Sequence, residues 1–109
     1  MAAINMTREM FNKEMEKGSV ILVDYWAPWC GYCRRIEPAY QKIAQQYSGK
    51  VLVGKVNIDD EPILAAQEQI EVIPTLIIYQ NGQALGSIVA PESKAAIEEF
   101  IHKALEGVQ

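Results

Sequence analysis

Cys30 and Cys33 are the two cysteines of this chain, and two residues separate them. The apolar run ahead of them, Val20 to Val23, predicts a buried strand. Behind them, apolar residues recur at helical spacing at Ile36, Tyr40, Ile43 and Tyr47. A thiol at a helix start meets unpartnered backbone N–H groups and the positive end of the helix dipole, and both favour the reactive thiolate. The pair can close into a disulfide and open again, so this placement predicts dithiol–disulfide exchange.

Half of a zinc site is the main alternative for a Cys-x-x-Cys pair. Structural zinc takes four ligands, whereas this chain adds only one histidine, His102, to its two cysteines. The helical pattern of the last segment places His102 on the outer face of that helix. The ligand count therefore favours redox chemistry, and we expect no bound metal.

Composition and charge narrow the classes of protein to which this chain can belong. The chain has 109 residues, of which 50% are hydrophobic, and this predicts one globular domain spanning residues 1–109. The net charge of −4 argues against a nucleic-acid partner, and the apolar runs are too short to cross a membrane. Residues 1–13 lack the apolar segment of a signal peptide. We therefore expect a cytoplasmic protein, in which a Cys-x-x-Cys pair is more often redox-active or metal-binding than structural.

The elements that must position the cysteines alternate along the chain. We expect strands at 20–26, 51–58, 75–80 and 83–89, a weaker edge strand at 3–6, and helices at 7–16, 33–47, 62–69 and from 93 onward. Thr7 and Ser93 would cap the first and last helices. The first helix should turn Met10, Phe11 and Met15 inward, and the apolar face of the last helix should run from Ile97 to Val108.

Alternating strands and helices give parallel β-α-β pairing. The dipeptide Asn81-Gly82 is typical of a type I′ hairpin, which adds an antiparallel end. The sequence thus predicts an α/β fold with a central mixed β-sheet and helices on both faces. Chemistry in such sheets gathers at the carboxyl ends of strands, where Trp26 leads into Cys30.

Asp24 is the most informative residue outside the cysteine pair. Strand alternation puts it on one face with Leu22 and Trp26, in the interior. A buried carboxyl is costly when charged, and its pKa rises. Lys55 falls on a neighbouring strand and is the natural charge partner. The alternative is a polar residue at a strand end beside a solvated lysine, but an aspartate inside so apolar a strand favours a functional role.

Four segments of the chain together resemble the thioredoxin family, in order and at the family's spacing: Val23 to Arg34, Lys55 to Asp59, Val72 to Thr75, and Asn81-Gly82. The resemblance covers almost the whole chain, with Cys-Gly-Tyr-Cys at the active site. It implies a thioredoxin fold and a protein-disulfide reductase that acts in electron transport and cell redox homeostasis. The reversible Cys30–Cys33 disulfide would be the redox-active center, without another cofactor. Protein disulfides would be the substrates of a monomer, and a thioredoxin reductase-type flavoprotein would supply electrons.

The resemblance also implies a role for each site residue. Cys30 would attack the substrate disulfide, Cys33 would resolve the mixed disulfide, and Asp24 would accept the proton of Cys33 with Lys55 beside it. Pro74 would be a cis-proline that leaves the Ile73 backbone free to pair with an extended substrate. The substrate-binding residues would be Trp29, Gly31, Tyr32, Ile73, Pro74 and Ala90.

Three residues depart from the family pattern at the border of the expected substrate groove. Tyr32 stands where a proline is typical, Val72 where a small residue is usual, and Ala90 where glycine is common. We expect the Tyr32 side chain to point outward, towards the substrate. Two alternatives stay open: a more oxidising, isomerase-like exchange protein, and a non-enzymatic binding module built on the same fold.

Overall fold

The computed structural model describes residues 2–107, so Val108 of the predicted apolar helix face lies outside the described part. Nine elements follow one another within these residues: β1 (Ile4–Asn5), α1 (Arg8–Lys17), β2 (Ile21–Trp26), α2 (Gly31–Gln46), β3 (Leu52–Asn57), α3 (Pro62–Gln67), β4 (Thr75–Gln80), β5 (Gln83–Val89) and α4 (Lys94–Glu106). The five strands form one sheet in the order β1-β3-β2-β4-β5. Strands β1, β3 and β2 pair in parallel, whereas β4 and β5 join in antiparallel fashion.

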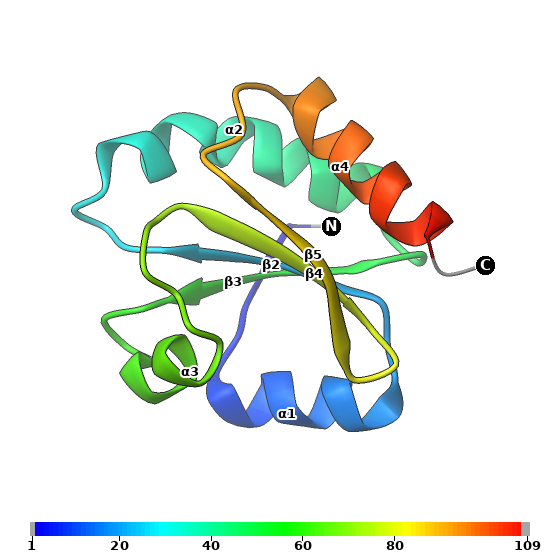
Figure 1. The fold of residues 1–109 in the computed structure, drawn as a ribbon. Helices are drawn as coiled ribbons and strands as arrows, with labels where there is room; N and C mark the ends of the chain where they lie inside the picture. The colour runs from blue at the N-terminus through cyan, green and yellow to red at the C-terminus, as the bar shows by residue number, and fades with distance from the viewer. Residues whose placement is uncertain (1, 108–109) are drawn as a thin grey trace.

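Helices cover both faces of this sheet, as Figure 1 shows. Helices α2 and α4 lie on one face, and α1 and α3 lie on the other. The predicted mixed α/β architecture is thus confirmed. The second helix begins at Gly31 and not at Cys33, because Cys30 already acts as its N-cap. The third helix ends earlier than expected, at Gln67, and Gln69 just beyond it adopts a positive φ of 58°.

Each face of the sheet carries its own apolar cluster. Strand β2 supplies both, because its side chains alternate: Leu22 joins the cluster under α2 and α4, whereas Val23 joins the cluster under α1 and α3. In α1, Phe11 is fully buried and Met15 packs beside it. The prediction that Met10 faces inward was wrong. Its side chain is 39% exposed, because it precedes Phe11 by about 100° around the helix.

The local signals read from the sequence are present at the element ends. The Thr7 hydroxyl accepts a hydrogen bond from the Met10 N–H, and the Ser93 hydroxyl accepts one from the Ala96 N–H. Both residues of the hairpin turn have positive φ, 54° at Asn81 and 75° at Gly82, as a type I′ turn requires.

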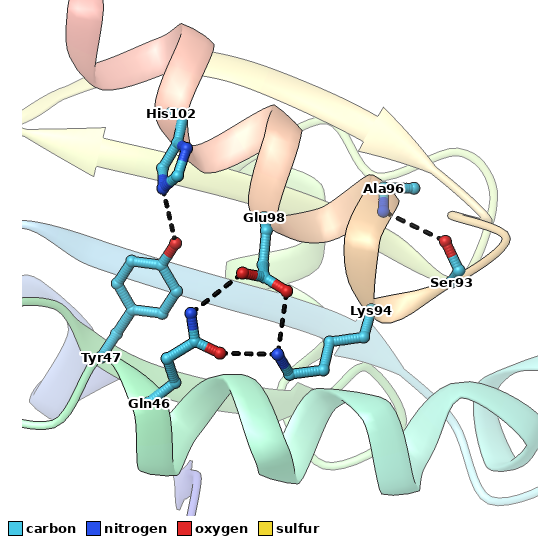
Figure 2. A network of polar contacts seen from close by, with 7 residues as sticks. All are labelled: Gln46, Tyr47, Ser93, Lys94, Ala96, Glu98 and His102. Carbon is cyan, nitrogen blue, oxygen red and sulfur yellow. Dashed lines mark hydrogen bonds and ion pairs between the residues drawn. The ribbon is translucent and has the colours of Figure 1, made fainter.

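A polar network joins α4 to the last turns of α2 (Figure 2). Lys94 Nζ donates to both Gln46 and Glu98, and Gln46 Nε2 donates to the other Glu98 oxygen. The His102 ring, expected on a solvated face, is exposed but has a partner: its Nε2 lies 3.1 Å from the Tyr47 hydroxyl. These contacts fasten α4 to the helix that carries Cys33.

Candidate redox site

The two cysteines lie where the turn after β2 leads into α2. Cys30 is the N-cap of α2, and a disulfide joins it to Cys33 across a Cα–Cα distance of 5.2 Å. The Cys33 backbone N–H donates a hydrogen bond to Cys30 Sγ at 3.1 Å. Cys30 is 8% exposed and Cys33 only 1%. The sulfur nearer the solvent is therefore also the one at the positive end of the helix dipole.

Trp29 lies beside the disulfide as the most exposed large apolar side chain of the described residues, at 66%. Its indole Nε1 donates to Asp59 Oδ2 at 2.9 Å, which ties the turn before the cysteines to the loop after β3. The Arg34 guanidinium donates to the Pro28 carbonyl at 2.7 Å. Two side-chain hydrogen bonds thus hold the turn that presents Cys30.

Asp24 is completely buried in the middle of the sheet. It pairs in register with Lys55 on β3 and with Leu76 on β4, and no protein group in the described chain donates to either of its carboxylate oxygens. Burial raises the pKa of Asp24 to about 7, with Lys55 lowering it and Glu37 raising it. A carboxyl with a pKa near neutrality can both take up and release a proton under ordinary conditions.

Lys55 does not form the direct ion pair with Asp24 that the sequence suggested. Its Nζ donates to Glu37 Oε2 at 2.5 Å and stands 4.1 Å from the centre of the Trp26 ring. Sequence reasoning missed Glu37. The available signal was its position one helical turn after Cys33, at i+4, on a helix whose inner face points at β2 and β3.

An open cleft of about 430 Å³ runs beside these groups. It is lined by Trp26, Cys33, Arg34, Glu37 and Lys55. Cys33 and the Lys55–Glu37 ion pair therefore line the same cleft, although Cys33 itself is almost fully buried.

Tyr32 does not point outward, and that prediction was wrong. Its ring packs against the cluster under α2 and α4, and its hydroxyl donates to the Pro91 carbonyl at 3.1 Å. The Arg35 guanidinium covers the ring from 5.9 Å. The side of α2 on which the Tyr32 ring lies is covered by the segment before α4. This segment supplies the carbonyl that accepts the hydrogen bond from the Tyr32 hydroxyl.

The remaining predicted site residues come together at the ends of β4 and β5. The peptide bond between Ile73 and Pro74 is cis, as the resemblance led us to expect. The Ala90 N–H donates to the Pro74 carbonyl at 2.9 Å, so these two residues are direct neighbours. Because Tyr32 reaches Pro91, the same contacts connect the cysteine turn to this pair. Ala90 has a φ of 47°, in the left-handed region where glycine is the easier residue.

Val72 stays exposed just before this bend, and its carbonyl accepts a hydrogen bond from the Thr75 hydroxyl at 2.6 Å. Gly31 is exposed as well. Within residues 2–107, no group of three or more His, Cys, Asp or Glu side chains is placed to hold a metal ion. In the same part of the chain, none of the helices combines the length and apolar character that a membrane crossing needs.

Comparison with known proteins points in the same direction as this geometry. The model of the thioredoxin family matches residues 2–103. Thioredoxin 1 of Nostoc sp. is 43% identical over 105 residues, which cover 95% of this chain and 98% of the relative. Thioredoxin 1 of Synechococcus elongatus is 42% identical over 104 residues, covering 94% and 97% of the two chains. The thioredoxin of Porphyra purpurea is 36% identical, with the same coverage.

Proposed function

This chain belongs to the thioredoxin family and is a thiol–disulfide oxidoreductase that reduces protein disulfides, and on that premise we propose that Cys30 attacks the substrate, Cys33 resolves the mixed disulfide and Asp24 accepts the Cys33 proton. One observation carries the first assignment: Cys30 caps α2, and the Cys33 N–H already donates to its sulfur. The same donor and the helix dipole would stabilise a Cys30 thiolate.

The reaction would proceed in two exchanges. The Cys30 thiolate attacks one sulfur of the substrate disulfide; a Cys30–substrate bond forms, and the other substrate sulfur leaves as a thiolate that takes a proton from water. Cys33 then gives its Sγ proton to the Asp24 carboxylate and attacks Cys30 Sγ. The Cys30–Cys33 disulfide forms, the second substrate sulfur leaves, and two electrons have passed to the substrate.

Burial supports the role of Asp24 in the second exchange. A thiol as covered as that of Cys33 meets little water, so a nearby base must take its proton. The Asp24 carboxylate has no hydrogen-bonded partner among the described residues and a pKa raised by burial to about 7. Such a group binds a proton more readily than an ordinary carboxylate does. Lys55, which pairs with it in register on β3, would act as the cation that lowers its pKa.

The substrate would lie over the rim around Cys30. We assign this rim to Trp29, Gly31, Tyr32, Ile73, Pro74 and Ala90. The exposed ring of Trp29 and the exposed side chain of Val72 offer apolar contact, and an extended segment could pair with the backbone at Ile73. Tyr32 would contribute through its backbone and ring edge, since its hydroxyl is engaged with Pro91.

The cellular setting completes the proposal. The protein would work as a monomer in the cytoplasm, where thiols are kept reduced, with no cofactor beyond its own disulfide. A thioredoxin reductase-type flavoprotein would return the disulfide to the dithiol, and neither nucleic acid nor a membrane would be a partner.

Insulin reduction tests the activity. In the presence of dithiothreitol, catalytic amounts of the protein should accelerate the precipitation of reduced insulin chains. The matched control is the variant in which both cysteines are serine, which should leave the reaction at its uncatalysed rate. Wild-type protein that also left insulin at the uncatalysed rate would contradict a reductase and support a binding module.

Tyr32 sets an expectation for the reduction potential. Proline at the second helical residue has no N–H, whereas Tyr32 adds an N–H donor beside Cys30. A better-stabilised thiolate makes the disulfide more oxidising, so the potential should be less negative than the about −270 mV of thioredoxin, part of the way to the about −180 mV of protein disulfide isomerase. Tyr32→Pro should make it more negative by about 30 mV or more, which is ~1.4 kcal/mol.

Titration against glutathione buffers measures this potential in both proteins. Tyr32→Phe is the matched control, because it keeps the N–H and loses only the bond to Pro91; its potential should stay at the wild-type value. A Tyr32→Pro potential that is unchanged or less negative rules the argument out. A strongly oxidising wild-type value would favour the isomerase-like alternative.

A further inference from the structure

Glu37 is a charged side chain of the cleft beside Cys33, and no role has yet been given to it. Both of its carboxylate oxygens accept a hydrogen bond: Oε2 from Lys55 Nζ at 2.5 Å, and Oε1 from Gln41 Nε2 at 2.6 Å. Gln41 is itself fixed, since its Oε1 accepts the Ala3 N–H at 2.8 Å. Glu37 is thus held both by Lys55 and by Gln41, which is itself bonded to the N-terminal segment.

The Lys55 ammonium interacts with two carboxyl groups, those of Glu37 and Asp24. Lys55 pairs in register with Asp24 on the adjacent strand, so the two side chains leave the same face of the sheet. Its ammonium nevertheless goes to Glu37, and Asp24 keeps no hydrogen-bonded partner in the described chain. The lysine side chain is only 11% exposed. An ammonium so little hydrated needs a carboxylate partner, and without Glu37 the remaining candidate is Asp24.

We propose that Glu37 is a positioning residue of the redox site: it holds the Lys55 ammonium in an ion pair at the cleft and thereby keeps Asp24 from forming an ion pair of its own. This inference rests on the proposed role of Asp24 as proton acceptor. A carboxylate paired with an ammonium is a weak base, whereas an unpaired buried carboxylate takes a proton readily. Glu37 would therefore preserve the basicity that the transfer from Cys33 to Asp24 requires.

The surroundings of Asp24 leave few other groups to account for its titration. From β3 it faces Lys55, and from β4 it faces the apolar Leu76. Helix α2 contributes Glu37 and Tyr40, besides Cys33 when reduced. The Tyr40 hydroxyl is buried against the Gly54 carbonyl at 2.7 Å, and burial raises its pKa well above the usual value, so it stays neutral. The two charges that act on Asp24 are those of Lys55 and Glu37.

Carboxyl carbon NMR of the oxidised protein tests this directly. In the disulfide form neither cysteine titrates, so the midpoint of Asp24 can be followed without turnover. Glu37→Gln keeps the shape and removes the charge; the Asp24 midpoint should fall by about one pH unit, because Lys55 turns to it. Glu99→Gln breaks an exposed ion pair with Lys103 on α4 and is the matched control, which should leave the midpoint in place.

The same pair of measurements in a Lys55→Met background shows whether Glu37 acts through the lysine. There the effect of Glu37→Gln should shrink to less than about half, since only the direct charge of Glu37 remains. An unchanged midpoint in Glu37→Gln, or an equal shift in both backgrounds, would overturn the inference.

Single-turnover resolution of a mixed disulfide supplies the second readout. The acid limb of its pH profile should move down with the Asp24 midpoint in Glu37→Gln. A midpoint that moves while the profile stays still would leave the positioning of Lys55 standing and refute Asp24 as the proton acceptor. The two proposals therefore fail separately.

Discussion

Cys30→Ser should abolish disulfide reduction completely, whereas Cys33→Ser should leave a protein that captures substrates and does not release them. The difference follows from position. Cys30 is the N-cap of α2 and is the more exposed of the two sulfurs, and Cys33 lies inside the first turn. Without Cys30 nothing reachable attacks the substrate; without Cys33 the first exchange still occurs, but no thiol breaks the mixed disulfide.

Two measurements separate these outcomes. Insulin turnover should vanish in both variants, but only Cys33→Ser should accumulate a mixed disulfide with substrate, visible by mass spectrometry and released by dithiothreitol. Iodoacetamide should alkylate Cys30 in Cys33→Ser rapidly at neutral pH, and Cys33 in Cys30→Ser slowly, because it is buried. Equal alkylation rates in the two variants would show that attacker and resolver had been assigned wrongly.

Asp24→Ala should make the protein more stable at pH 8 and less active. The folded state raises the pKa of Asp24 from 3.8 to about 7, so the folded protein binds the proton more tightly than the unfolded chain does. The stability that comes from this tighter proton binding is fully present below pH 3.8 and is lost as the pH rises to about 7. The loss amounts to about 4 kcal/mol at pH 8, from a shift of about 3 units at 1.36 kcal/mol each.

Without the carboxyl this loss of stability does not occur. The small cavity that alanine leaves offsets part of the gain. A net gain of about 2 kcal/mol would raise Tm by roughly 10 °C at pH 8. At pH 4 the gain should largely disappear, because Asp24 is then protonated in the folded protein. Calorimetry at the two pH values measures the difference. Glu16→Ala, which changes an exposed acid of α1, is the control and should alter Tm at neither pH.

The same substitution that raises stability should lower the turnover rate. Without Asp24, Cys33 loses its proton acceptor, and insulin reduction should slow while the first exchange at Cys30 continues. A lower Tm at pH 8 together with unchanged turnover would show that Asp24 is only a structural residue.

Much of the architecture could be predicted from the sequence, because its signals are local. The hairpin depends on two residues that accept positive φ, and the sequence placed Asn81 and Gly82 at the observed turn. Thr7 and Ser93 satisfy backbone donors within one turn of themselves. The strands Thr75–Gln80 and Gln83–Val89 have the predicted bounds, since a continuous apolar run followed directly by a tight turn leaves little freedom there.

The interior position of Asp24 was also predictable, because a strand has a period of two and the neighbouring residues are apolar. The sequence could likewise place Cys30 at a helix start. It could not place the start of α2 two residues earlier, at Gly31, since the cap is made by the cysteine itself, a residue type that is not among the preferred N-caps.

Side-chain partners across elements were decided by the tertiary structure alone. Lys55 has two carboxylates to choose from, and only the packing of α2 on β3 brings Glu37 to its Nζ. Tyr32 turned inward because the segment before α4 supplies the Pro91 carbonyl, 59 residues away in sequence. Periodicity tells which face a residue occupies; which group from a distant segment meets it there depends on how the layers pack, and no local pattern encodes that.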